Sequence, residues 1–189
     1  MAATPPLKLL LTDLHPNVKP EHESAPHVSS HPESVDALNL PPKLASAQIL
    51  SLTGSLHHFT HDQVRQFLES AVSCGSSLFV LDGVASLKSV LLMPLRSFCW
   101  AIVAGTWYGV ARCDLRQIVL TFTGVLPMCM AYDALISALR FYSRNEIEEI
   151  IQQVSGHNDY VWDLSRWGSL PECSIMLAYP KKTPSVVDQ

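Results

Sequence analysis

The chain has 189 residues, of which 48% are hydrophobic, and a formal net charge of −4. This size suits one buried core, so we expect a single domain over residues 1–189. The 13 lysines and arginines form no basic stripe, which excludes nucleic acid as the expected partner. The five cysteines lie mostly in apolar stretches without a CxxC pair, which predicts buried free thiols in a reducing compartment and no metal site. No secretory signal is evident, so a cytoplasmic protein is expected.

The first third of the chain alternates predicted strands with polar connections. Residues 1–6 form a short tail, and Leu7–Thr12 has the length and composition of a buried strand. Residues 15–33 are rich in proline and histidine and predict a loop, because proline interrupts both helices and strand ladders. Ser34–Leu38 and Ala47–Leu52 are the next predicted strands.

A capped helix and a further strand follow. Thr60 and Gln63 stand at the spacing of a capping box, which predicts a helix over His61–Ser73. Gly75 is well placed to end that helix. Ser77–Leu81 is mostly apolar, and its composition predicts a fully buried strand.

An apolar region over residues 87–132 admits two interpretations. The first interpretation is a pair of membrane helices at 90–110 and 118–136, since each stretch approaches the ~20 residues that cross a bilayer. Arg96 inside the first stretch and Asp133 in the second argue against this interpretation, because charges are costly inside a bilayer. The preferred interpretation is a pair of buried helices, or a lid over a substrate.

The last third predicts two helices and two strands. Asp133–Phe141 continues a helix, and Ser143 with Glu146 forms a second capping box that begins another. The expected strands are Tyr160–Asp163 and Cys173–Tyr179, and the final tail is residues 181–189. This alternation predicts an α/β fold, with a mostly parallel sheet, helices on both faces and a C-terminal antiparallel hairpin.

Three short motifs at strand ends carry a resemblance to a known family. Asp13 follows the first predicted strand, Asp36 and Ala37 follow the second, and Thr53 begins the stretch Thr53–Phe59 after the third. In this order they resemble the class I S-adenosylmethionine-dependent methyltransferases, which have a Rossmann-like sheet. The resemblance implies that Asp13 binds the ribose hydroxyls of S-adenosylmethionine, that Asp36 and Ala37 hold the adenine, and that Thr53 lies beside the methyl donor.

The chain departs from that family at its beginning. The family starts with a strand and a Gly-rich turn, and none of the eight glycines here forms such a turn. The family's first strand lies between its second and fourth strands and has no counterpart here. We therefore expect a fold that is incomplete at the N-terminus, a truncated protein that is weakly active or inactive alone, and strand edges that favour self-association.

His57 and His58 are the candidate catalytic residues. They lie between a predicted strand and a helix, at the end of the sheet where α/β proteins bind ligands. A histidine there can act as a general base for a hydroxyl acceptor, and the apolar region predicts a small apolar acceptor. The alternatives are a non-catalytic remnant that binds a partner and a small membrane protein. A peripheral membrane contact through residues 90–132 is a further expectation.

Overall fold

The computed structural model describes residues 8–16, 27–41, 44, 49–168 and 172–181. The expected tail over residues 1–6, most of the loop 15–33 and most of the tail 181–189 lie outside the described residues. The strands are β1 (Leu9–Leu11), β2 (Val28–Ser30), β3 (Ile49–Thr53), β4 (Ser77–Gly83), β5 (Tyr160–Trp167) and β6 (Cys173–Pro180). The helices are α2 (His61–Ser73), α3 (Leu87–Ala111), α4 (Leu115–Phe122), α5 (Val125–Arg140) and α6 (Arg144–Gln153), with the 3₁₀ turns η2 (Leu56–His58) and η3 (His157–Asp159).

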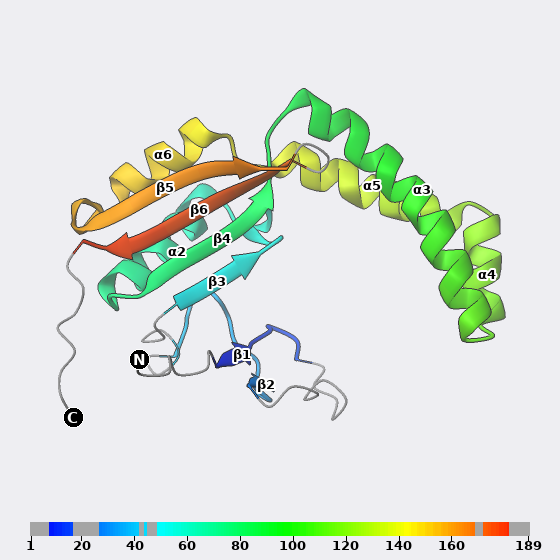
Figure 1. Ribbon diagram of the computed structural model, residues 1–189, viewed down its shortest axis with the longest axis horizontal. Helices are drawn as coiled ribbons and strands as arrows, with labels where there is room; N and C mark the ends of the chain where they lie inside the picture. Colours follow the sequence, from blue (N-terminus) through cyan, green and yellow to red (C-terminus); the bar gives the residue numbers. More distant parts are fainter. Residues whose placement is uncertain (1–7, 17–26, 42–43, 45–48, 169–171, 182–189) are drawn as a thin grey trace, which may run out of the picture.

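A four-stranded sheet in the order β3-β4-β6-β5 forms the centre of the molecule (Figure 1). β3 and β4 are parallel, with Ser51 opposite Phe79. β6 runs antiparallel to β4 on one side and to β5 on the other, so β5 and β6 form the predicted C-terminal hairpin. The α/β class is confirmed, although within this sheet only the β3–β4 pair is parallel.

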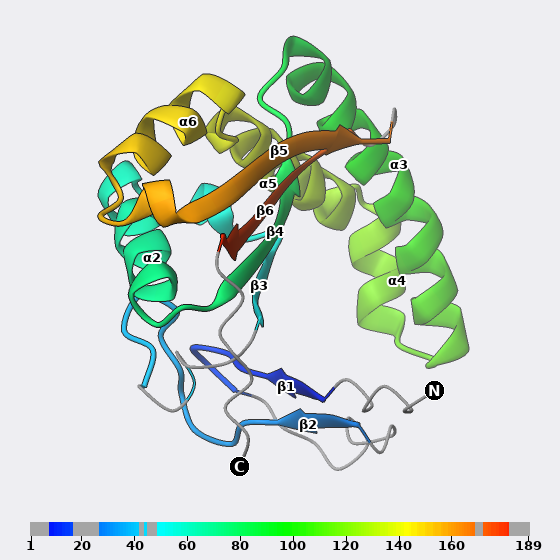
Figure 2. The same cartoon turned by 60° about the vertical axis from the view of Figure 1, so that its left-hand side comes forward.

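β1 and β2 form a separate parallel pair on the β3 side of the molecule (Figure 2). The first predicted strand is therefore present as Leu9–Leu11, but it is exposed and not buried as predicted. It does not join the main sheet among the described residues. The predicted strand at Ser34–Leu38 was wrong, because the Asp36 carboxylate accepts the Leu38 N–H at 2.9 Å and forms a turn instead. β1 and β3 belong to different sheets among the described residues, so the expected gap between them stays a prediction.

Helices α2 and α6 cover one face of the sheet (Figure 2). Val64 and Leu68 of α2 are fully buried, and they pack in one cluster with Val80 of β4 and Met176 of β6. Phe79 and Leu81 point to the opposite face of β4 and are only partly buried. β4 is therefore half-buried and not fully buried as predicted. Helices were expected on both faces of the sheet. The described helices that pack on this core are α2 and α6, and both lie on the same face.

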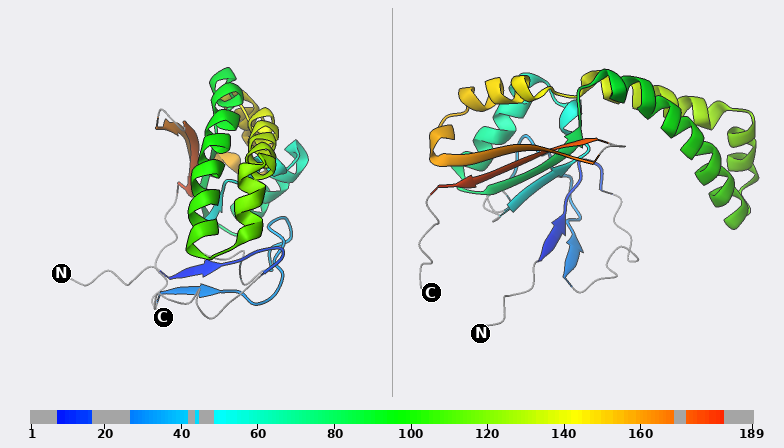
Figure 3. Two further views of the ribbon diagram at one scale, coloured as in Figure 1. Left: turned by 90° about the vertical axis from the view of Figure 1, so that its right-hand side faces the viewer. Right: turned by 45° about the horizontal axis from the view of Figure 1, so that its top comes forward.

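Helices α3, α4 and α5 form an arm that leaves the sheet at one end (Figures 1 and 3). α5 runs back along α3, and α4 packs against the far part of α3. The most apolar 18-residue window of α3 is only 11% buried, so the expectation of buried helices here was wrong. The expectation of buried thiols was also wrong, because Cys74 and the three arm cysteines Cys99, Cys113 and Cys129 are exposed.

Both predicted capping boxes are present. The Thr60 hydroxyl accepts the Gln63 N–H, and the Gln63 side chain accepts the Thr60 N–H at 2.9 Å. Ser143 and Glu146 make the same reciprocal pair at the start of α6. Each box satisfies two N–H groups at a helix start, which have no partner inside the helix.

Thr60→Ala removes one half of the first box, and we expect it to lower the free energy of unfolding by about 1 kcal/mol. Thr12→Ala is the control, because Thr12 is exposed and lies outside any helix. Its expected effect is within about 0.5 kcal/mol. Urea denaturation of both variants measures the difference, and equal effects would contradict a capping role for Thr60.

Candidate active site

The candidate site lies where β3 and β4 end side by side. The Gly54 N–H donates to the Leu81 carbonyl at 2.8 Å, which holds the end of β3 against β4. Gly54 has a φ of 63°, a backbone conformation that favours glycine, and it turns the chain into η2. The turn places Leu56 in the core and His57 over the end of β4.

The Asp82 carboxylate at the end of β4 binds His57 twice. One carboxylate oxygen, Oδ2, accepts the His57 backbone N–H at 2.8 Å. The other, Oδ1, lies 2.9 Å from the ring Nδ1 of His57 and also accepts the Gly83 N–H at 2.8 Å. The side chains are 7% and 6% exposed, so this pair is almost completely removed from water.

The hydrogen bond to Asp82 determines which ring nitrogen of His57 carries the proton. An ionised carboxylate only accepts hydrogen bonds, so Nδ1 donates and Nε2 of the neutral ring keeps a free lone pair. Nε2 of His57 is the one buried side-chain nitrogen or oxygen among the described residues that has no hydrogen-bond partner. A buried acceptor without a partner is costly, which makes this nitrogen unusual among the described residues.

Aromatic rings fix the plane of the His57 ring. The Phe141 ring packs edge-on against it with centroids 5.1 Å apart, and the His58 ring lies 4.2 Å away. Phe141 in turn lies against Gly83, where an added Cβ would be 2.1 Å from the Phe141 ring. Gly83 therefore has to lack a side chain for Phe141 to hold His57.

His57 lies between two cavities. One, of about 350 Å³, is lined by Thr53 at the end of β3, by Asp82 and by residues of α3 and α5. The other, of about 460 Å³, lies toward the start of α2 and includes Tyr142. Burial, and then the Glu146 carboxylate, raise the pKa of Tyr142, whose hydroxyl donates to the Phe59 carbonyl. Tyr142 is therefore a protonated donor at neutral pH.

The first cavity is largely apolar. Its walls from the arm are Met93 and Ser97 of α3, and Met130, Asp133, Ala134 and Ser137 of α5. Phe141 and Leu81 close it toward the sheet. A small molecule with an apolar body and one polar group suits this lining.

Of the residues predicted from the sequence, the structure brings His57 and Thr53 to one cavity. His58 is exposed and lines only the second cavity. Asp13 and Asp36 lie near each other beyond β1, since the Asp13 carbonyl accepts the Val35 N–H at 2.8 Å. Asp13, Asp36 and Ala37 are not among the residues that line the His57 cavity.

The functional residue that sequence reasoning missed is Asp82. It follows the predicted strand Ser77–Leu81 directly and is 25 positions from His57. The parallel pairing of β3 with β4 is what brings the two together. An acidic residue at the end of the neighbouring strand was the available signal.

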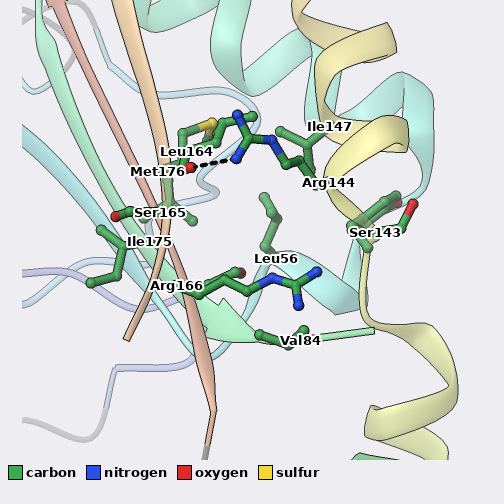
Figure 4. Close-up of a pocket in the computed structure, with 13 residues that line it drawn as sticks. Leu56, Val84, Ser143, Arg144, Ile147, Leu164, Ser165, Arg166, Ile175 and Met176 are labelled. Atoms are coloured by element: carbon green, nitrogen blue, oxygen red, sulfur yellow. Dashed lines mark hydrogen bonds between the residues drawn. The ribbon is translucent and has the colours of Figure 1, made fainter. Parts of the chain in front are cut away.

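A third cavity lies between β5 and α6, with Arg144 and Arg166 on its walls (Figure 4). The Arg144 guanidinium donates to the Leu164 carbonyl at 3.2 Å and pairs with Glu148 at 2.7 Å. Arg166 lies 3.6 Å from Glu172. The cavity measures about 50 Å³, which is room for a water or two and not for an organic ligand. Among the described residues, no three histidines, cysteines or acids are grouped to hold a metal ion.

No family model matches the sequence, and no curated protein matches it. Among solved structures, the chain is similar to an O-methyltransferase family protein from Burkholderia thailandensis, at 10% identity and a TM-score of 0.40, over 85% of this chain and 38% of that one. It is also similar to a "putative Zn-dependent alcohol dehydrogenase" from Rhodobacter sphaeroides, at 10% identity and a TM-score of 0.48, over 82% and 67%. The chain thus spans well under half of the O-methyltransferase family protein. Structural similarities this distant do not decide an activity.

The protonation of His57 is directly measurable. We expect ¹⁵N NMR to show a protonated Nδ1 and an unprotonated Nε2 in the neutral ring, because Asp82 accepts from Nδ1. Asp82→Asn, whose amide can donate to Nδ1, should shift the proton to Nε2. His27→Asn is the control, because His27 is exposed and lines neither cavity, and it should leave the His57 signals in place. An unchanged tautomer in Asp82→Asn would contradict the assigned role of the carboxylate.

Proposed function

We propose that the cavity beside His57 binds a small apolar molecule with a hydroxyl group, and that His57 accepts the hydroxyl proton during methyl transfer from S-adenosylmethionine. The observation that carries this proposal is the buried His57–Asp82 pair with an unpartnered Nε2. A histidine oriented by a carboxylate is a general base in many enzymes, and it serves a hydroxyl because the alkoxide or phenoxide is the better nucleophile.

In the proposed step the acceptor hydroxyl donates its proton to Nε2 of His57. S-adenosylmethionine, if bound beside this cavity, would supply the methyl group to the deprotonated oxygen and would leave as S-adenosylhomocysteine. Asp82 stabilises the resulting imidazolium through its hydrogen bond to Nδ1. Nε2 of His57 is itself buried, so a proton that it accepts is shielded from solvent.

The residues present suit S-adenosylmethionine only in part. Asp13 is exposed, and its Oδ1 accepts the His15 N–H at 2.8 Å, which leaves a carboxylate face for ribose hydroxyls. Asp36 is already engaged, because its two oxygens accept from Leu38 and from the Asn39 amide at 2.7 Å. These bonds, first that from Leu38, lower the pKa of Asp36 and keep it ionised. The sequence has no Gly-rich turn for the amino-acid end of the molecule.

The first test of this proposal is the affinity for S-adenosylmethionine. We expect a dissociation constant of about 1 mM or weaker for this chain, because the carboxylate contacts act without a Gly-rich turn. Asp13→Ala should weaken binding further, by about 1–3 kcal/mol. Ligand-observed NMR measures this range. Micromolar binding would contradict the expected weakness, and undetectable binding would favour a non-catalytic, partner-binding protein.

The second test is the role of His57 in turnover. We expect His57→Asn to lower the formation of S-adenosylhomocysteine by about 10²–10⁴-fold with apolar alcohols and phenols as acceptors. His27→Asn should keep the wild-type rate, since His27 is exposed and lines neither cavity. Turnover that survives His57→Asn would remove the proposed base.

A further inference from the structure

We infer that the arm formed by α3, α4 and α5 is a docking surface for a lipid bilayer that contains anionic lipids. By length and composition α3 alone qualifies as a membrane helix, and the bent pair α4–α5 as a second at most, among the described residues. The helix of a soluble core passes the same test but is mostly buried, whereas the apolar window of α3 is 11% buried. The inference goes beyond the proposed reaction and does not depend on it.

The arm is packed with small residues inside and large apolar residues outside. Gly105 and Gly109 of α3 are buried against α4, where an added Cβ at Gly105 would be 2.4 Å from Oγ1 of Thr121. Trp107, two positions from each glycine and so on the other side of the helix, is 72% exposed, and Val103 is 62% exposed. Water-soluble helices place their large apolar side chains inward, and membrane helices use small residues at their contacts. The packing of the arm therefore follows the membrane pattern.

The exposed apolar surface covers all three helices. Its large members are Leu87, Leu91, Leu95, Trp100, Val103, Trp107, Tyr108 and Val110 on α3, Leu115, Val119, Leu120 and Phe122 on α4, and Val125, Met128, Met130, Tyr132 and Leu139 on α5. Figure 3 shows these helices projecting away from the sheet, so they are free to meet a surface without moving the α/β domain. Exposed apolar side chains gathered on one arm in this way mark an interaction site.

The charge of the arm selects an anionic surface. Residues 87–140 carry five cationic side chains, Lys88, Arg96, Arg112, Arg116 and Arg140, and two anionic ones, Asp114 and Asp133. The arm is thus net positive although the whole chain carries −4. Anionic lipids attract such a segment and repel the remaining, negatively charged domain, which orients the protein on the bilayer.

The positions of the charges limit how deeply the arm enters. The uncharged stretches are residues 97–111 of α3 and residues 117–132, which span α4 and the first part of α5. Each is shorter than the ~20 residues that cross a bilayer. Arg112, Asp114 and Arg116 lie at the connection of α3 to α4, with Arg112 stacked on Tyr108. These groups stay with the headgroups, so the arm lies in the interface and does not cross.

The base of the arm also reaches the candidate active site. Met93 and Ser97 of α3 and Met130 of α5 line the cavity beside His57. If the proposed function holds, an apolar acceptor dissolved in the bilayer would enter the cavity between these residues. The entry of an acceptor from the bilayer depends on the proposed function, but the docking of the arm does not.

Vesicle binding without any substrate tests the inference. We expect the protein to sediment with sucrose-loaded phosphatidylcholine vesicles, and more strongly when phosphatidylglycerol is included. Raising the salt concentration should remove only the additional binding that phosphatidylglycerol gives. Trp107→Glu should lower the vesicle partition coefficient by at least about tenfold, because a carboxylate resists transfer into lipid.

Trp167→Glu is the matched control. Trp167 is 69% exposed, nearly as much as Trp107, but it lies on β5 of the sheet domain, and its replacement should leave vesicle binding unchanged. Circular dichroism checks that both variants keep the wild-type helix content. Equal losses in the two variants, or no sedimentation with either vesicle, would overturn the inference. A lipid-free dimer that Trp107→Glu dissociates, without vesicle binding, would show that a second copy covers the arm instead.

Discussion

The arrangement of this molecule depends on the contact between the Asp82 carboxylate and His57. It joins the turn after β3 to the end of β4 through the backbone and the ring of His57. Because both carboxylate oxygens are buried and engaged, the turn cannot shift without leaving a charge unpaired. The same contact holds the turn so that Leu56 lies in the core and His57 lines the cavity at the strand ends. Stability and the proposed chemistry thus use one hydrogen-bonded pair.

The protein places its apolar residues in two environments. Those of α2, α6, β4 and β6 form a core on one face of the sheet. Those of the arm lie mostly on its surface, around a contact built from small residues. The apolar cavity lies at the junction of the two, between the strand ends and the bases of α3 and α5. A molecule that leaves a lipid surface through the arm would meet His57 before it met water.

The candidate site was accessible from the sequence only in part. His57 could be found because a strand, a glycine and a helix N-cap follow one another locally, and this order places the residues between them at the end of a sheet. Asp82 could not be paired with it, since the contact spans 25 positions and depends on the parallel register of β3 with β4. The cofactor roles of Asp13, Asp36 and Thr53 stay predictions. Thr53 lines the His57 cavity, whereas the other two do not.

The sequence by itself determined the local structure. The Thr60 and Ser143 capping boxes and the helix His61–Ser73 formed as predicted, because their hydrogen bonds lie within a few residues. Only the tertiary structure decided the strand partners and the exposure of the apolar region. β1 pairs with β2, a segment interpreted as loop, since backbone pairing depends on neighbours in space and not on composition. The apolar composition of α3 suits a protein core and a lipid surface equally. Its exposure was settled by the packing of Gly105 and Gly109 against α4, which turns the large side chains outward.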